Sequence, residues 1–142
     1  MYFRILFLIS IIGIAACGNT KKGIVYQNIS VKDSIIFGEG GGFTGAVISW
    51  SIKNNGDIDS LDSEFKPVTK IGKIGAQRAQ ELIDEARKTL PQLPFENPGN
   101  WYQIVKVTNG NTVQTATFTE TNTTYFALFQ ELKMELAKLY TK

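Results

Sequence analysis

The chain contains 142 residues, with 15 Lys and Arg residues against 13 Asp and Glu residues, no histidine and a single cysteine. A formal net charge of +2 leaves no excess of basic residues for nucleic acid binding, which requires a basic patch. The absence of histidine removes Ser-His-Asp and Cys-His nucleophilic sites, His-ligated zinc and the commonest general base near neutral pH. One cysteine alone cannot form a disulfide within the chain. We therefore expect no catalytic residue, no metal site and no cofactor.

The first residues have the composition of an export signal. Met1–Arg4 carry one positive charge, Ile5–Ile14 are mostly apolar, and Ala15 and Ala16 precede Cys17. The apolar stretch is too short to span a membrane, which takes about 20 apolar residues. The order of a basic, an apolar and a small-residue segment is typical of a signal peptide. Two alternatives stay open: a secretory signal that contains a cysteine by chance, and a short buried helix.

This N-terminal order resembles the lipobox of bacterial lipoproteins, in which a signal peptidase cleaves just before a cysteine. Ile14 replaces the leucine that usually stands three positions before that cysteine. The resemblance implies that residues 1–16 are removed as a signal peptide and that the Cys17 thiol carries a diacylglycerol. It also implies that the new amino terminus is acylated, for example with palmitate. Because two or more acyl chains anchor a protein stably, we expect a lipoprotein anchored to a bacterial membrane in the cell envelope, periplasmic or surface-facing.

The remaining chain is predicted to contain a tether and one domain. Residues 17–28 form the lipidated cysteine and a polar tether, and residues 29–142 form a single α+β domain. Alternating or β-branched segments predict strands at residues 31–37, 46–53, 58–65, 101–108 and 112–119. Apolar residues at three- and four-residue steps predict helices at residues 70–90, after a Thr69 cap, and from an Asn122 or Thr121 cap to about Tyr140.

The predicted element order is β-β-β-α-β-β-α. Asn-Gly pairs at residues 55–56 and 109–110 are typical of tight hairpin turns, which join neighbouring antiparallel strands. Each predicted helix has one apolar face that must be buried against another layer. The sequence therefore predicts an α+β fold with an about five-stranded, mainly antiparallel sheet and two amphipathic helices packed on one face.

Gly38–Gly45 is so rich in glycine that it is predicted to form an irregular loop. Residues 40–45 match the pattern GxGxxG, but a dinucleotide site requires a helix after the glycines, and a strand is predicted there instead. Two interpretations of the segment stay open. It is either a bulged turn that needs several positive φ angles, or an exposed loop in which Phe43 is an aromatic anchor for a partner.

Other side chains have both a functional and a structural interpretation. The acidic residues Asp57, Asp59, Asp62 and Glu64 are either a calcium site, since Ca²⁺ prefers oxygen ligands, or a solvated strand edge that discourages aggregation. Trp50 and Trp101 either line a ligand pocket or pack on the sheet. A hydrolase based on paired carboxylates is a further alternative.

The stretch Ile36–Gly45 (IFGEGGGFTG) resembles small bacterial lipoproteins that carry an FGxGGGFTG segment near the start of the mature domain. It is also similar to emfourin-type inhibitors of thermolysin-like metalloproteases. Those inhibitors open with a strand, a Gly-Gly-Phe-x-Gly turn and a second strand. Gly41, Gly42, Phe43 and Gly45 match that turn, and the resemblance implies that these residues shape the loop or contact a protease.

The expected function is therefore that of a membrane-anchored, non-catalytic binding domain. Its partners would be the membrane, through the N-terminal lipid, and a protein such as a protease. Protease inhibition is the most concrete version of this hypothesis. The alternative is a structural or accessory lipoprotein of the cell envelope that has no ligand site.

Overall fold

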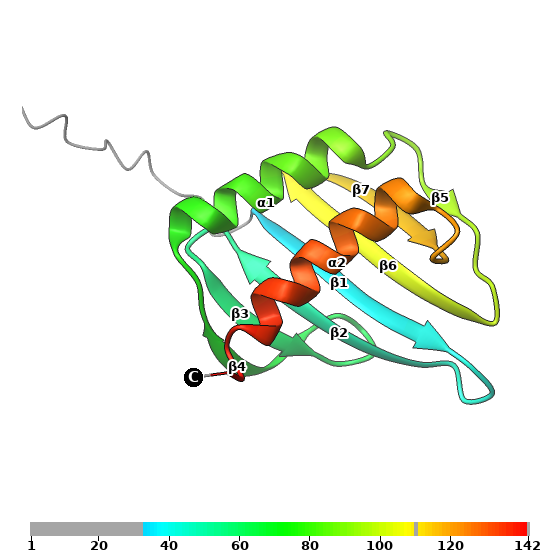
Figure 1. The fold of residues 1–142 in the computed structure, drawn as a ribbon, viewed down its shortest axis with the longest axis horizontal. Helices are drawn as coiled ribbons and strands as arrows, with labels where there is room; N and C mark the ends of the chain where they lie inside the picture. The colour runs from blue at the N-terminus through cyan, green and yellow to red at the C-terminus, as the bar shows by residue number, and fades with distance from the viewer. Residues whose placement is uncertain (1–32, 110, 142) are drawn as a thin grey trace, which may run out of the picture.

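The computed structural model describes residues 33–109 and 111–141, which form one sheet and two helices (Figure 1). The helices are α1 (Ala76–Thr89) and α2 (Thr123–Ala137). The strands are β1 (Ser34–Gly41), β2 (Ala46–Lys53), β3 (Asp57–Leu61), β4 (Pro67–Lys73), β5 (Phe95–Glu96), β6 (Trp101–Asn109) and β7 (Thr112–Phe118). The α+β class is confirmed.

The predicted signal peptide, the tether of residues 17–28 with Cys17, and the first residues of the predicted strand at 31–37 lie outside the described residues. Within the described ranges, neither helix has the length and hydrophobicity needed to cross a membrane. The domain boundary predicted at residue 29 also falls outside these ranges.

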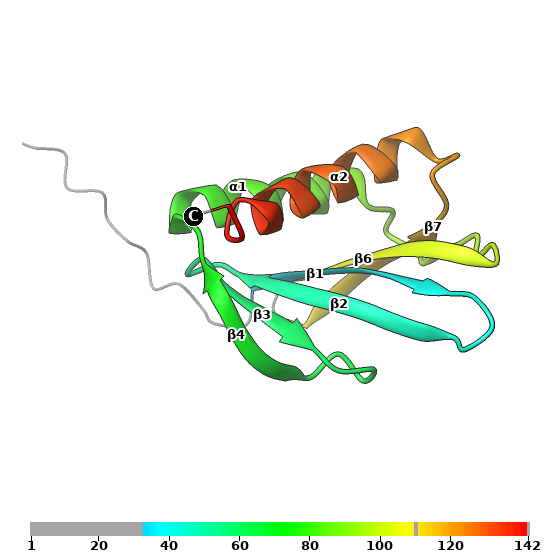
Figure 2. The same ribbon diagram turned by 60° about the horizontal axis from the view of Figure 1, so that its bottom comes forward.

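The molecule has two layers, with the sheet on one side and both helices on the other (Figure 2). The sheet has seven strands in the order β4-β3-β2-β1-β6-β7-β5. Five pairings are antiparallel, whereas β5 pairs with β7 in parallel. The predicted number of about five strands is therefore corrected to seven, and the sheet, though mainly antiparallel as predicted, is mixed because of the β5–β7 pair.

β4 is formed by residues that were expected to begin the first helix. The predicted helix started at Lys70 after a Thr69 cap, whereas α1 starts after Gly75, which is its N-cap. A Cβ atom at Gly72 would lie only 2.8 Å from Cδ1 of Leu139, so the glycine lets the chain after α2 pack directly on the strand. Pairing with β3 and this packing outweigh a helix propensity that two glycines already weaken.

β3 ends at Leu61, earlier than the predicted end at Phe65. The reason is a turn organised by Asp62, whose Oδ1 accepts hydrogen bonds from the backbone N–H groups of Glu64 and Lys66 at 2.9 Å. Phe65 itself has a φ of 60°, which an extended strand does not allow. The short side chain of Asp62 therefore competes successfully with strand pairing.

The second half of the chain differs less from the predictions. The connector expected at residues 91–99 contains the short strand β5, in which Phe95 packs against Tyr125 with 5.4 Å between ring centroids. The predicted cap of the last helix is confirmed for Asn122, whose side chain accepts a hydrogen bond from the backbone N–H of Tyr125 at 3.2 Å. This cap satisfies one of the free N–H groups at the start of α2.

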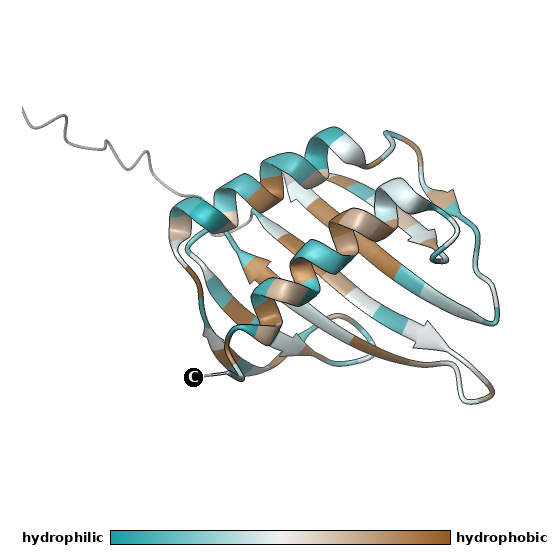
Figure 3. Cartoon of the chain, in the orientation of Figure 1, coloured by the Kyte–Doolittle hydropathy of each residue, from teal (hydrophilic) through white to brown (hydrophobic). Residues whose placement is uncertain are grey.

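The core lies between the sheet and the two helices, where apolar segments of the strands lie beneath α1 and α2 (Figure 3). Ile35 and Phe37 of β1 are fully buried. Phe129 of α2 contacts both Phe37 and Phe118, with 6.4 Å between ring centroids in each case. Burying each of these large side chains stabilises the fold by about 1.5–3 kcal/mol.

Replacement of Leu132 tests this arrangement. Leu132 lies on α2 and is fully buried, so we expect Leu132→Ala to lower the free energy of unfolding by about 2–5 kcal/mol. Urea denaturation measures the change. Met134→Ala is the matched control, because Met134 lies on the same helix but is 58% exposed, and it should change stability by about 0.5 kcal/mol or less. Equal effects of the two substitutions would contradict the assigned core.

Candidate functional site

The hairpin of β1 and β2 carries the candidate residues and extends beyond both helices (Figures 1 and 2). The irregular loop predicted for residues 38–45 is wrong in its first half, because β1 continues to Gly41. This residue pairs with Ala46 of β2 on one side and with Trp101 of β6 on the other. Residues 42–45 alone form the tip of the hairpin.

Close packing explains why glycines occupy the end of β1. A Cβ atom at Gly38 would lie 2.7 Å from the Cβ atom of Ser49 on β2. A Cβ atom at Gly40 would lie 3.1 Å from Oη of Tyr102 on β6. The glycines are therefore compatible with a strand here, and neighbouring chains fill the space that their side chains would need.

The tip has a backbone conformation that favours glycine. Gly41, Gly42 and Gly45 have φ angles of 117°, 69° and 63°, which other residues adopt at a cost. The N–H of Gly42 donates to the carbonyl oxygen of Asn100 at 2.7 Å, and the N–H of Gly45 donates to that of Gly42 at 3.3 Å. These glycines shape the turn, as expected if the segment needs positive φ angles.

Phe43 is the side chain that the turn presents to solvent. Its relative exposure is 108%, so its ring has almost no contact with the rest of the chain. Two other large apolar side chains near this end are also exposed, Ile48 at 60% and Trp101 at 59%. The strand register places Ile48 and Trp101 on the sheet face that carries the helices, since Phe37 and Trp50 pair on that face. Isolated exposed apolar residues are common, but a group of them is informative.

The two tryptophans have different environments. Trp50 is half-buried beside the core, with its ring centroid 5.7 Å from that of Phe37 and the Nζ atom of Lys133 4.9 Å away. This contact supports the structural interpretation for Trp50. Trp101 instead lies exposed beside the tip.

The acidic residues considered as a calcium site or a solvated edge are Asp57, Asp59, Asp62 and Glu64. Asp59 pairs with Lys53 at 2.6 Å and Asp57 pairs with Lys70 at 2.8 Å. The hydrogen bond from Lys70 lowers the pKa of Asp57 more than burial raises it. Across residues 33–109 and 111–141, no group of three or more His, Cys, Asp or Glu side chains is placed to hold a metal ion. The solvated-edge interpretation is corrected, because β3 lies between β2 and β4 and Asp59 is buried.

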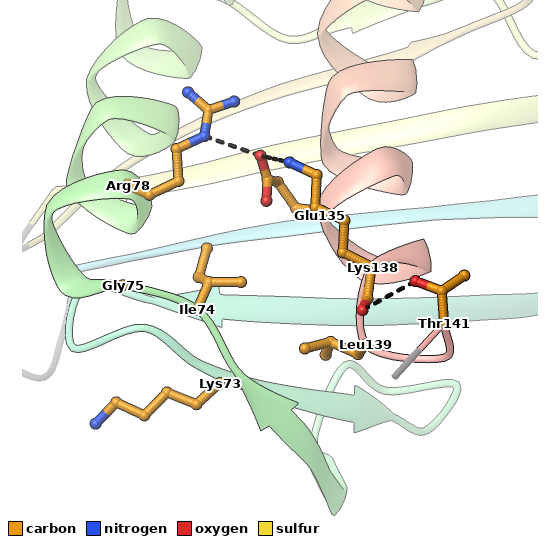
Figure 4. Close-up of a pocket in the computed structure, with 8 residues that line it drawn as sticks. All are labelled: Lys73, Ile74, Gly75, Arg78, Glu135, Lys138, Leu139 and Thr141. Atoms are coloured by element: carbon orange, nitrogen blue, oxygen red, sulfur yellow. Dashed lines mark hydrogen bonds and ion pairs between the residues drawn. The ribbon is translucent and has the colours of Figure 1, made fainter.

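A cavity of about 460 Å³ lies between the end of β4, the start of α1 and the end of α2 (Figure 4). It is lined by Lys73, Ile74, Gly75, Arg78, Glu135, Lys138, Leu139 and Thr141. Oε1 of Glu135 accepts hydrogen bonds from Nε of Arg78 and Nζ of Lys138, both at 2.9 Å. Burial raises the pKa of Glu135, but the hydrogen bonds from Lys138 and Arg78 outweigh it and lower the pKa. This carboxylate is held as an anion by two cations, and the lining supplies no second acid of the kind that paired-carboxylate hydrolysis requires.

The charges beside this cavity join the two helices. Nη2 of Arg78 on α1 lies 2.5 Å from Oε1 of Glu131 on α2. Hydrogen bonds to Glu131 and Glu135 raise the pKa of Arg78. Burial, and then the charge and hydrogen bonding of Glu131, raise the pKa of Glu85. Ion pairs therefore join the two helices here. Glu85 beside them loses its proton less readily than a carboxyl group in water.

No family model matches the chain, and no curated protein matches it either. Function is therefore inferred from residues and geometry. Sequence reasoning identified the tip glycines and Phe43, but it missed Asn100, which accepts the hydrogen bond from Gly42, and the exposure of Ile48. The alternation in β2 did place Ile48 on one face with Trp50, yet nothing in the sequence shows where the helices stop covering that face.

Replacement of Gly41 and Gly45 should separate the cost of a positive φ angle from the cost of a steric clash. A Cβ atom at Gly41 would lie 2.3 Å from the carbonyl oxygen of Asn100, so we expect Gly41→Ala to destabilise the fold by at least about 2 kcal/mol. Gly45 has no atom near its Cβ position, and Gly45→Ala should cost only about 1 kcal/mol. Thermal or urea unfolding measures both. Equal losses of stability would show that the positive φ angle alone, and not the close approach of Asn100, explains the glycine at position 41.

Glu85 gives a test of pH dependence. Its pKa in the fold is raised above the unfolded value of about 4.3, so the folded state binds the proton more tightly and stability falls as pH rises through this range. Glu85→Gln should therefore raise the free energy of unfolding at pH 7, and the gain should shrink as the pH falls toward about 4. Urea titrations at several pH values measure it, with Glu120→Gln, in the turn between β7 and α2, as the control. A gain in stability that is independent of pH would contradict the raised pKa of Glu85.

Proposed function

We propose that the protein is a bacterial cell-envelope lipoprotein, anchored through Cys17, whose non-catalytic domain binds a partner protein through the tip of the β1–β2 hairpin. The observation that carries the binding role is the complete exposure of Phe43 on a turn that hydrogen bonds hold in place. Because the backbone of the turn is already held, the ring of Phe43 can fill a partner's pocket with little loss of backbone conformational entropy.

Protease inhibition is the most concrete version of this proposal. The similarity of residues 41–45 to the turn of emfourin-type inhibitors motivates it, and the turn at residues 42–45 lies at the end of the sheet that the helices leave uncovered, where it could approach an active-site cleft. The ion pairs around Asp57, Asp59 and Glu135 support a non-catalytic role, because these carboxylates are bonded to cations within the domain.

A structural or accessory lipoprotein is the second candidate function. One observation favours it: Gly41, Gly42 and Gly45 all have positive φ angles, so turn geometry alone accounts for the glycines of the segment. Under this alternative, Phe43→Ala would leave every pulldown partner and every cellular phenotype unchanged.

Titration against thermolysin-like metalloproteases tests the inhibitor version. We expect inhibition at micromolar or lower concentrations, and we expect Phe43→Ala to weaken it about 30-fold, as for an aromatic hot spot worth about 2 kcal/mol. Val68→Ala is the matched control, because Val68 is 65% exposed on β4, away from the hairpin. No inhibition at micromolar concentration would remove the inhibitor version.

Mass spectrometry of the protein from its own cells tests the anchor. We expect the mature chain to start at a triacylated or diacylated Cys17, and we expect Cys17→Ala to prevent lipidation and membrane retention, since acyl chains supply the membrane affinity. An N-terminus that retains residues 1–16, or an unmodified Cys17, would refute the anchor.

A further inference from the structure

Trp101 lies against the backbone of the tip although much of its ring is exposed. A Cβ atom at Gly42 would lie 3.3 Å from Cζ3 and 3.6 Å from Cε3 of Trp101, so the indole covers this part of the turn. The preceding residue, Asn100, accepts the hydrogen bond from the Gly42 N–H at 2.7 Å. The start of β6 therefore holds the turn that presents Phe43.

The two chain segments that form the tip and its neighbouring strand ends carry no charge. Residues 40–52 and 97–105 contain no Asp, Glu, Lys or Arg. The nearest charged residue in β1 is Glu39, which lies opposite Ile48 in the sheet, and its charge is compensated by Lys133, whose Nζ lies 3.0 Å from its Oε1. An uncharged apolar surface matches an uncharged apolar pocket, because a charged partner would lose hydration without gaining an opposite charge.

The position of the tip also indicates whether its partner is a protein or the membrane. The chain from Cys17 enters β1 at Ser34, whereas the tip follows the other end of that strand, about 25 Å away for a strand of this length. Anionic membranes attract clustered Lys and Arg side chains, and the tip has none. Both facts favour a partner protein over the membrane that would hold the lipid.

We infer that Trp101 is a positioning residue for Phe43, and that Phe43, Trp101 and Ile48 form one contact surface for a protein with an uncharged, apolar pocket. This inference rests on the proposed binding function. It adds two contact residues from β2 and β6 to the hairpin tip, and it specifies the chemistry of the partner.

NMR relaxation of the full chain tests the positioning role without any partner. In the wild type we expect backbone order parameters of about 0.85 for residues 42–45, and in Trp101→Ala values below about 0.6. Trp101→Phe keeps a ring against Gly42 and should restore most of the order. Unchanged order parameters in Trp101→Ala would overturn the positioning role, and loss of order in Trp101→Phe to the same extent would also overturn it.

Photo-crosslinking in the native cells tests the contact surface. A photoreactive phenylalanine analogue is placed at position 43, 48 or, as control, 68. We expect one and the same protein adduct from positions 43 and 48, none from 68, and about a fivefold lower yield from position 43 when Trp101→Ala is added. Phospholipid adducts, no adduct, or the same adduct from position 68 would overturn the inference. Failure to inhibit thermolysin would remove only the inhibitor version and would leave both measurements decisive.

Discussion

Strand β1 is paired on both sides along its length, and the contrast between its two halves constrains the rest of the molecule. Its first half supplies Ile35 and Phe37, which are fully buried beneath the helices. Its second half is mostly glycine, and neighbouring strands approach too closely for side chains at Gly38 and Gly40. On the face that carries the helices, Phe37 is followed by Glu39 and Gly41, so the large side chains that attach the helices to the sheet stop midway along β1. Beyond the ion pair of Glu39 with Lys133, the hairpin continues without a helix over it (Figure 1).

This contrast places the residues that stabilise the fold apart from the residues of the proposed binding surface. The fold depends on the aromatic and aliphatic contacts under α1 and α2 and on the ion pairs of Arg78 with Glu131 and Glu135. The tip depends on backbone hydrogen bonds and on glycine, and its exposed side chains contribute little to folding. A substitution at Phe43 therefore changes the surface without changing the core, whereas Gly41 is fixed by both φ and close approach.

Local patterns predicted the elements whose formation depends on nearby residues. The alternation in β2, the last helix with its Asn122 cap, and the positive φ angles of the tip were all visible in the sequence. β4 and β5 were not, because distant residues decide both. Leu139 packs on Gly72 in β4, and β5 consists of two residues held in parallel by β7. The glycines of β1 were expected to break the strand, since glycine propensity describes backbone freedom and says nothing of a neighbour that needs the space.

The candidate site likewise combines residues that are close in sequence with residues that only the fold brings near. The sequence indicated Phe43 and its flanking glycines, but the support that Asn100 and Trp101 give to the turn comes from a strand far along the chain. This support bears on both interpretations of the segment, because it holds the turn in either case. Turn geometry accounts for each glycine, yet it does not account for a phenylalanine whose ring touches almost nothing. One exposed apolar side chain is ordinary in a folded protein. An exposed ring on a turn that Asn100 and Trp101 support is the arrangement that the proposed contact with another protein requires.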